Sequence, residues 1–178
     1  MTIRWLLPLL MLAACGPMID VRADYDTSAD FSRLRTYAWL QQPSSAPRDP
    51  RINNDLLDSR VHSAVNDELH AKGYTEDAAS PDFRVAYHVV LKEKIAATAF
   101  PTYYGYGLGR WPGPADVQVA TYEEGTLLLD FVDGRTNELV WRGAASTRIN
   151  PDRTPQERTE LIRTAVQKML KDFPPPRK

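Results

Sequence analysis

The sequence contains very little cysteine, little net charge and no long apolar segment after its first residues. Its 178 residues include one cysteine, Cys15, so no disulfide can form within the chain. Basic and acidic residues nearly balance, at 22 and 23, which excludes the basic footprint of a nucleic-acid-binding protein. No later segment approaches the roughly 20 apolar residues of a transmembrane helix. We therefore expect one domain stabilised by its own core and no nucleic-acid partner.

The N-terminal segment has the three parts of a secretory signal. Arg4 carries a positive charge, residues 5–12 form an apolar core, and two alanines provide the small residues that precede a cleavage site. The sequence Leu-Ala-Ala-Cys that ends at Cys15 resembles the lipobox of bacterial lipoproteins, whose cysteine receives a lipid. We therefore expect lipidation of Cys15. The alternatives are a transmembrane helix, for which the run is too short, and an ordinary signal with an incidental cysteine.

These features predict the division of the chain. We expect a signal peptide over residues 1–14, a lipidated N-terminus and short tether over 15–18, a domain over 19–173 and a proline-rich tail over 174–178. Several acyl chains hold a protein at a membrane much more firmly than one. The residue after the cysteine is Gly16 and not aspartate, which favours the outer membrane in Gram-negative sorting. We expect a periplasm-facing outer-membrane lipoprotein whose partner is membrane lipid.

Period-two alternation and β-forming residues predict five strands. Residues 19–26 and 82–92 alternate between apolar and polar side chains, and residues 36–40 are rich in strand-forming types. Residues 117–132 and 138–149 flank a turn sequence. These connections favour an antiparallel sheet.

The last two predicted strands define a hairpin register. If Val132 faces Val140, then Asp130 faces Arg142, and such opposite charges stabilise a pair of strands. Gly125 lies inside the first of these strands, where a glycine is typical of a β-bulge.

Two amphipathic helices complete the predicted fold. Residues 52–72 carry apolar side chains three or four apart, and Gly73 follows as a left-handed C-terminal cap. A second helix begins after Thr154, which with Glu157 forms a capping box, and continues to Phe173. The order is strand, strand, helix, strand, strand, strand, helix. We predict a single α+β domain, a mainly antiparallel sheet of about five strands with both helices on one face.

Residues 96–115 have no period and contain much glycine and proline, so we expect a long loop. Its aromatic side chains have a polar group on an apolar body, which suits glycans, protein partners or a membrane interface. The alternatives are a lid over the open sheet face, and disorder. The candidate binding residues in this loop are Tyr103, Tyr104, Tyr106 and Trp111.

Acidic residues near the first strand have the spacing that opens a calcium loop. Such a loop also needs glycine at its sixth and glutamate at its twelfth position, which are Ala29 and Arg35 here. Solvent-facing and turn residues explain Asp24, Asp26 and Asp30 better. We expect no metal site.

Other residues that could support chemistry have ordinary structural explanations. His62 and His70 would lie about 12 Å apart on the first helix, too far apart to share a metal, so we interpret these two and His88 as surface residues. Adjacent Glu123 and Glu124 would point to opposite faces of a strand. We expect no cofactor and no enzyme.

The two central tryptophans, Trp39 and Trp141, are expected to be core anchors. Asp130 and Arg142 are interpreted as a structural pair and not as a site.

Short motifs in a fixed order make the chain similar to a known family. The chain resembles the bacterial lipoproteins of the DUF4136 family, a domain of unknown function, over nearly its whole length after the signal. The family has no catalytic residues that could be assigned to positions of this chain. The resemblance implies an envelope-bound protein of uncharacterised role. The motifs are Asp24-Tyr25-Asp26, Asp30-Phe31, Thr36-Tyr37-Ala38-Trp39, Lys72-Gly73-Tyr74, Pro81-Asp82, Glu124-Gly125-Thr126-Leu127, Leu139-Val140-Trp141-Arg142-Gly143 and Phe173-Pro174-Pro175.

The sequence therefore predicts a non-catalytic lipoprotein domain that acts by interaction with envelope components. A ligand-binding or glycan-binding module that uses the aromatic loop over residues 100–112 is the alternative. An apolar pocket beneath that loop would favour the alternative, whereas a cleft of polar groups with perturbed pKa values would favour an enzyme.

Overall fold

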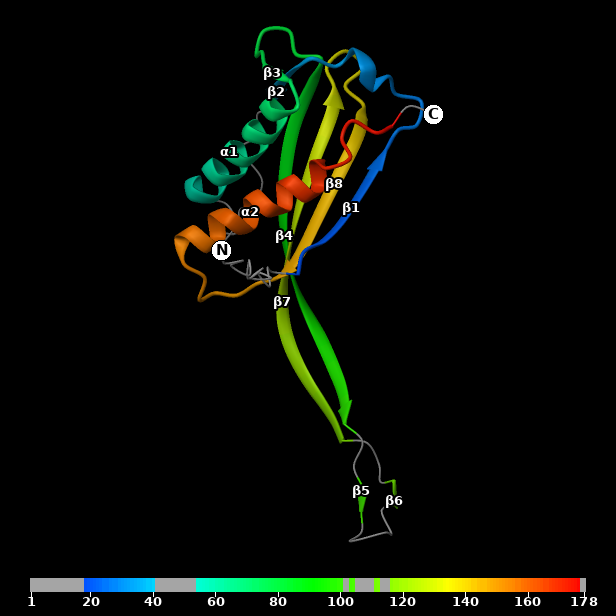
Figure 1. Ribbon diagram of the computed structural model, residues 1–178, viewed down its shortest axis with the longest axis vertical. Helices are drawn as coiled ribbons and strands as arrows, with labels where there is room; N and C mark the ends of the chain where they lie inside the picture. The colour runs from blue at the N-terminus through cyan, green and yellow to red at the C-terminus, as the bar shows by residue number, and fades with distance from the viewer. Residues whose placement is uncertain (1–17, 41–53, 101–102, 105–110, 113–115, 177–178) are drawn as a thin grey trace, which may run out of the picture.

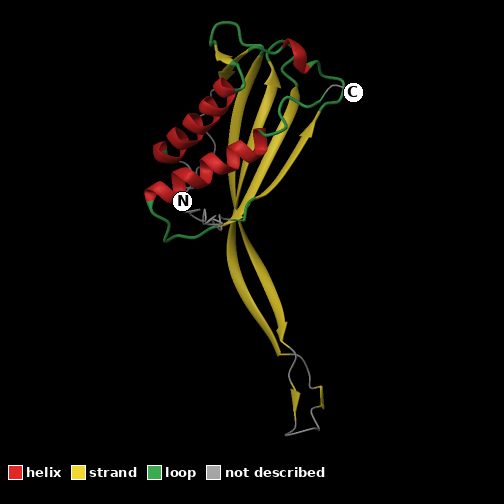
Figure 2. Ribbon diagram, in the orientation of Figure 1, coloured by secondary structure: helices red, strands yellow, loops and turns green. Residues whose placement is uncertain are grey.

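The computed structural model describes residues 18–40, 54–100, 103–104, 111–112 and 116–176. One sheet carries two helices on one face, and two of its strands continue beyond the others as a long hairpin (Figures 1 and 2). The elements are β1 (Asp20–Tyr25), η1 (Phe31–Arg33), β2 (Thr36–Trp39), α1 (Asp55–Ala71), β3 (Thr75–Glu76), β4 (Phe83–Phe100), β5 (Tyr103–Tyr104), β6 (Trp111–Pro112), β7 (Asp116–Asp133), β8 (Leu139–Arg148) and α2 (Pro155–Leu170).

The main sheet has six strands in the order β1-β8-β7-β4-β2-β3. Its β1–β8, β8–β7 and β7–β4 pairs are antiparallel, whereas β2 runs parallel to both β3 and β4. The predicted α+β single domain is confirmed. The sixth strand is β3, a two-residue edge strand that is too short to show a period in the sequence.

Aromatic side chains fill the centre of the core between the sheet and the helices. Phe173, just after α2, lies with its ring centre 4.8 Å from that of Phe131 and 5.4 Å from that of Trp141. Phe83 lies 5.0 Å from Phe131 in the same cluster. All four side chains are at most 2% exposed. Such rings provide large buried apolar areas and favourable edge contacts, so the predicted core role of Trp141 is confirmed.

Capping residues mark the ends of both helices. Asn54 accepts a hydrogen bond from the Leu57 backbone and starts α1, three residues later than predicted. The Thr154 side chain accepts from the backbone of Glu157, whose carboxylate accepts from the Thr154 N–H. The predicted capping box is therefore confirmed. Gly73 has a φ of 87°, as expected for a left-handed cap.

The β7–β8 hairpin differs from prediction at one point. Asp130 lies opposite Arg142 as predicted, but Val132 lies opposite Leu139 because an irregularity between Phe131 and Val132 shifts the register. The predicted pairing of Val132 with Val140 is therefore wrong.

The predicted bulge at Gly125 is also wrong, because Gly125 stays in register with both of its neighbouring strands. A β-carbon at this position would lie 2.6 Å from Cδ1 of Ile149. The glycine therefore provides space for that side chain and does not bend the strand.

Candidate functional site

The most exposed feature of the molecule is the continuation of β4 and β7 beyond the rest of the sheet. These strands pair without interruption from Phe83 opposite Asp133 to Phe100 opposite Asp116. The ladder of β8 on β7 ends earlier, at Glu124. Residues 93–100 and 116–123 therefore pair only with each other among the described strands. We call these two segments the arm, and Figure 1 shows it leaving the body of the molecule.

One face of the arm carries large aliphatic side chains. Ile95, Val117 and Val119 are 74%, 56% and 65% exposed. Alternation along β4 places Ile95 on the same face as Val89 and Leu91, which is the face that the helices cover in the body. The apolar face of the core thus continues along the arm, where no helix covers it.

Between its root and Asp116 at its far end, the arm has no charged residue. Residues 95–100 read Ile-Ala-Ala-Thr-Ala-Phe and residues 117–122 read Val-Gln-Val-Ala-Thr-Tyr. At the root, Lys94 pairs with Glu124 at 2.6 Å, and the Arg148 guanidinium lies 4.9 Å from the centre of the Tyr122 ring. Charged residues on an edge strand normally oppose pairing with other chains, and the arm lacks this protection.

The described chain begins at the root of the arm. The Met18 carbonyl accepts a hydrogen bond from the Thr147 hydroxyl at 3.1 Å, and Asp20 pairs with Ser146. Both partners lie at the end of β8 that is nearest to the arm. Cys15, the predicted lipidation site, precedes Met18 by three positions and lies outside the described residues.

The aromatic segment lies at the far end of the arm. Tyr103 and Tyr104 pair with Pro112 and Trp111 as the two-stranded β5–β6 sheet, and Figure 1 shows β5 and β6 remote from the body. This placement differs from that of a lid over the sheet. Tyr106 lies outside the described residues. The predicted loop also begins later than expected, since β4 continues to Phe100.

The acidic residues near β1 bind their own backbone. Asp26 accepts from the backbone and hydroxyl of Ser28, which lower its pKa. Asp30 accepts from the backbone and hydroxyl of Ser32 and caps η1. Across the described part of the chain, no three histidine, cysteine or acidic side chains are grouped to hold a metal ion.

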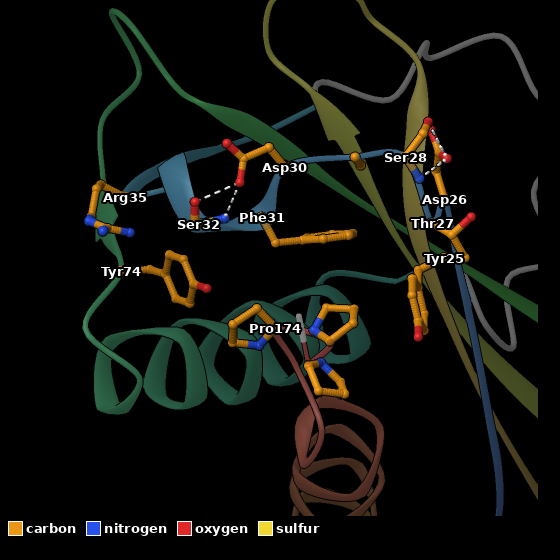
Figure 3. Close-up of a pocket in the computed structure, with 13 residues that line it drawn as sticks. Tyr25, Asp26, Thr27, Ser28, Asp30, Phe31, Ser32, Arg35, Tyr74 and Pro174 are labelled. Carbon is orange, nitrogen blue, oxygen red and sulfur yellow. Dashed lines mark hydrogen bonds between the residues drawn. The ribbon is translucent and has the colours of Figure 1, made fainter. Parts of the chain in front are cut away.

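A shallow hollow lies beside these turns, at the C-terminal end of β1. Its volume is about 550 Å³, and Figure 3 shows the rings of Tyr25, Phe31, Tyr74 and Pro174 around it. Asp30 lies at the border of the hollow, and its hydrogen bond with Ser32 joins two residues on the same side and does not cross the hollow. The two serine hydroxyls that line it, those of Ser28 and Ser32, each donate to the aspartate of their own turn.

The histidines are dispersed, but His62 stacks on a tryptophan and the Nε2 of His70 lies 3.3 Å from the hydroxyl of the buried Tyr37. His70 and His88 are exposed as predicted. His62 stacks on Trp39 with the ring centres 3.7 Å apart, and the indole Nε1 of Trp39 donates to Asn66 at 2.9 Å. Trp39 is thus half-buried and held by polar contacts, and the prediction that it is a core anchor describes it only in part.

The two most buried acidic residues are structural. The Arg142 guanidinium donates two hydrogen bonds of 2.6 Å to Asp130, as the sequence predicted. Asp133 accepts from Arg33 and from the backbone of Arg135 and Thr136. Burial alone would raise the pKa of Asp133, but these donors lower it. Only a turn motif in the sequence pointed to the hydrogen bonds around Asp133.

A match to a family model shows which protein family the chain belongs to. It describes a domain of unknown function, DUF4136, and matches residues 21–175. The chain belongs to the DUF4136 family. No curated protein matches this DUF4136 protein. Neither helix in the described residues has the length and apolar character needed to cross a bilayer.

Solved structures similar to the DUF4136 protein show its fold alone. A PDZ domain protein from Parabacteroides distasonis has a TM-score of 0.58 at 16% identity; the match covers 92% of this chain and 37% of that one. The DUF4136 protein thus spans little more than a third of that relative. Two structures of the PelC dodecamer from Paraburkholderia phytofirmans have TM-scores of 0.48 and 0.44, at 10% and 11% identity. Both matches cover 86% of this chain and 95% of the other.

Proposed function

We propose that this protein is a non-catalytic envelope lipoprotein, held in the outer membrane by a lipid on Cys15, whose arm contacts other envelope components. The observation that carries the proposal is the arm itself. Ile95, Val117 and Val119 are exposed on the part of the hairpin, residues 95–100 and 117–122, that has no charged residue. Exposed apolar surface of this kind is typical of interaction sites.

The position of the N-terminus supports a role for the arm near the membrane. Three residues span at most about 11 Å, so a lipid on Cys15 would keep Met18 close to the bilayer surface. Met18 is bonded to Thr147 at the root of the arm. The anchor and the arm therefore leave the body at the same end, and the arm would be near envelope components at that surface.

The open strand edges explain how a protein partner could bind. Among the described strands, the outer edge of β4 pairs with β2 only through Phe83, Arg84 and Val85, and β7 pairs with β8 only as far as Glu124. An extended segment of a partner can add to such an edge through backbone hydrogen bonds. Specificity would come from the alternating apolar side chains of the arm.

A second candidate function uses the end of the arm. The pairing of Tyr103–Tyr104 with Trp111–Pro112 places three aromatic residues on two neighbouring strands. Aromatic residues with polar groups are suited to glycan or protein contacts. The binding residues of this alternative are Tyr103, Tyr104, Tyr106 and Trp111.

The proposal is tested by site-specific photocrosslinking in cells that carry the full lipidated chain. A crosslinking amino acid at Ile95 or Val119 is expected to capture a discrete envelope partner. The matched control is Leu139, which is 44% exposed and lies at the opposite end of β7 and β8. Capture from Leu139 alone, or equal capture at all three positions, would contradict a role for the arm.

The anchor and the aromatic end are tested separately. Labelling with a fatty acid should be lost in Cys15→Ala, and labelling that persists would refute the anchor. Replacement of the four aromatic residues by alanine should leave capture from Ile95 intact if the strands form the contact. Loss of that capture would favour the second candidate.

A further inference from the structure

A groove opens between the two helices and the sheet, at the end of the body where the arm begins. Its volume is about 760 Å³, within the roughly 300–1,000 Å³ of ligand pockets. Val89 of β4, Leu127 of β7 and Ala145 of β8 line the sheet side. Leu57 of α1 and Leu161 of α2 line the helix sides. The lining is thus largely aliphatic and comes from five elements that are distant in the sequence.

Within the described residues, the helices leave this end of the core uncovered. Leu57 and Leu161 are only half-buried, and Leu56 at the groove is 67% exposed. In contrast, Val65 and Leu69, further along α1, are fully buried. A concave aliphatic surface that remains open to solvent is typical of a site for an apolar ligand.

Three arginines also line the groove. Arg60 donates to the Thr159 hydroxyl at 3.1 Å. Arg158 donates to two backbone carbonyls, at 3.0 and 2.8 Å, and Arg153 to one at 3.5 Å. None of the three forms an ion pair with a carboxylate within the described ranges. Glu123 is the one acidic side chain among the described lining residues, so positive charge predominates.

The partial positive charge of the two helix N-termini is offset by acidic residues in the same first turns, Asp55 and Asp58 in α1 and Glu157 in α2. α1 begins at Asp55 and α2 at Pro155, and residues from both first turns line the groove. The N-terminal end of a helix carries a partial positive charge that favours anions. The arginines therefore provide the positive charge of the groove, and an apolar groove with arginines matches a molecule that is apolar along one part and anionic at one end.

We propose that the groove binds a single-chain anionic amphiphile, with its acyl chain along Val89, Leu127 and Leu161 and its head group on Arg60 and Arg158. The planar guanidinium pairs with carboxylate and phosphate through two parallel hydrogen bonds. A lipid joined to Cys15 through neutral bonds has no such head group. The occupant is therefore a free lipid and not the protein's own anchor, and the site is independent of the proposed role of the arm.

Fluorescence titration of the full chain carrying Cys15→Ser with cis-parinaric acid tests the proposal. The emission of this fatty acid should rise on binding, and palmitate and lysophosphatidylglycerol should displace it. Methyl palmitate, which has the chain without the charge, should displace it about tenfold less well, as expected for loss of one charge-assisted hydrogen-bond pair. Palmitate and lysophosphatidylglycerol distinguish a carboxylate from a phosphate head.

Two sets of variants locate the site. Leu161→Glu and Ile149→Glu place a charge in the lining from opposite sides and should each weaken probe binding at least about tenfold. Gln167→Glu, on the exposed face of α2, is the matched control. Arg60→Gln should weaken palmitate binding and leave methyl palmitate unchanged, whereas Arg163→Gln should change neither.

Several results would overturn the proposal. One is an emission that does not rise with the Cys15→Ser chain. Others are unchanged binding in folded Leu161→Glu or Ile149→Glu, and an equal effect of Arg60→Gln on palmitate and its methyl ester. Probe binding by Cys15→Ser but not by the lipidated chain would show that the anchor's own acyl chain fills the groove. None of these results bears on crosslinking from the arm.

Discussion

Lys94 of β4 and Glu124 of β7 form an ion pair of 2.6 Å at the point where the arm leaves the body. Glu124 is also the last residue of β7 that pairs with β8. The hydrogen bond to Glu124 raises the pKa of Lys94. This pair therefore joins the two strands of the arm where support from the rest of the sheet ends.

Removal of this pair should loosen the arm and leave the body intact. We expect Lys94→Ala to speed amide hydrogen exchange in residues 95–100 and 117–122, because local opening there no longer breaks an ion pair. The melting temperature should change little, because exposed ion pairs contribute little to global stability. Lys168→Ala on α2 is the control. Unchanged exchange in the arm, or a large drop in melting temperature, would contradict this role.

Removal of Arg142 should destabilise the body by leaving a buried acid without its partner. Asp130 is 6% exposed and accepts two hydrogen bonds from Arg142. We expect Arg142→Ala to lower the free energy of unfolding by about 1–3 kcal/mol, toward the lower value because the Arg142 side chain is 47% exposed. Urea denaturation measures this change. The double variant with Asp130→Ala should lose less than the sum of the single variants, and simple additivity would show that the pair is not coupled.

Acid should destabilise the protein through Asp82 and Asp133. Burial alone raises both pKa values, but backbone donors and Arg33 lower them overall. A carboxylate with a lowered folded-state pKa contributes stability above its unfolded pKa of about 3.9, and that contribution is lost as the pH falls through the folded pKa. Melting temperature should therefore fall below about pH 4. Asp133→Asn should be less stable at pH 7 and show a weaker decrease in acid, and a curve parallel to that of the wild type would contradict this origin.

Gly134 is required because another chain segment lies where its side chain would be. A β-carbon at this position would lie 2.1 Å from the carbonyl oxygen of Pro81, and the Gly134 N–H donates to the Asp82 carbonyl at 2.8 Å. We expect Gly134→Ala to cost about 2–3 kcal/mol of unfolding free energy, at the upper end of typical substitutions. Arg135→Ala in the same turn is the control and should cost under about 0.5 kcal/mol. Equal stability of both variants would show that the two segments can separate freely.

Local sequence patterns were most informative where one side of an element faces the core. Apolar and polar residues alternate along β1 and the first half of β4 because one face of each strand packs against the core and the other faces solvent. The capping box at Thr154 and the left-handed Gly73 need only neighbouring residues, and both were predicted correctly. The DUF4136 relationship was also visible in the order of short motifs.

The half of the arm that belongs to β4 was missed for a related reason, whereas residues 117–122 were predicted as part of a strand. Residues 93–99 are exposed on both faces, so their sequence carries no polar and apolar alternation that would identify a strand. The role of Gly125 was missed because it depends on Ile149, which approaches from another segment. His62 was interpreted as a surface residue because its stacking partner, Trp39, comes from a distant strand.

The sequence by itself determined the α+β class, the left-handed C-terminal cap of α1 at Gly73, the capping box of α2 and the pairing of Asp130 with Arg142, because each depends on nearby residues or on a fixed hairpin register. Only the tertiary structure decided that two strands extend past their neighbours and that an aliphatic groove with three arginines opens beside their root. Both features arise where five or more helices and strands end at different points along the sheet. Where one segment ends relative to another that is distant in the chain is set by packing and not by local sequence.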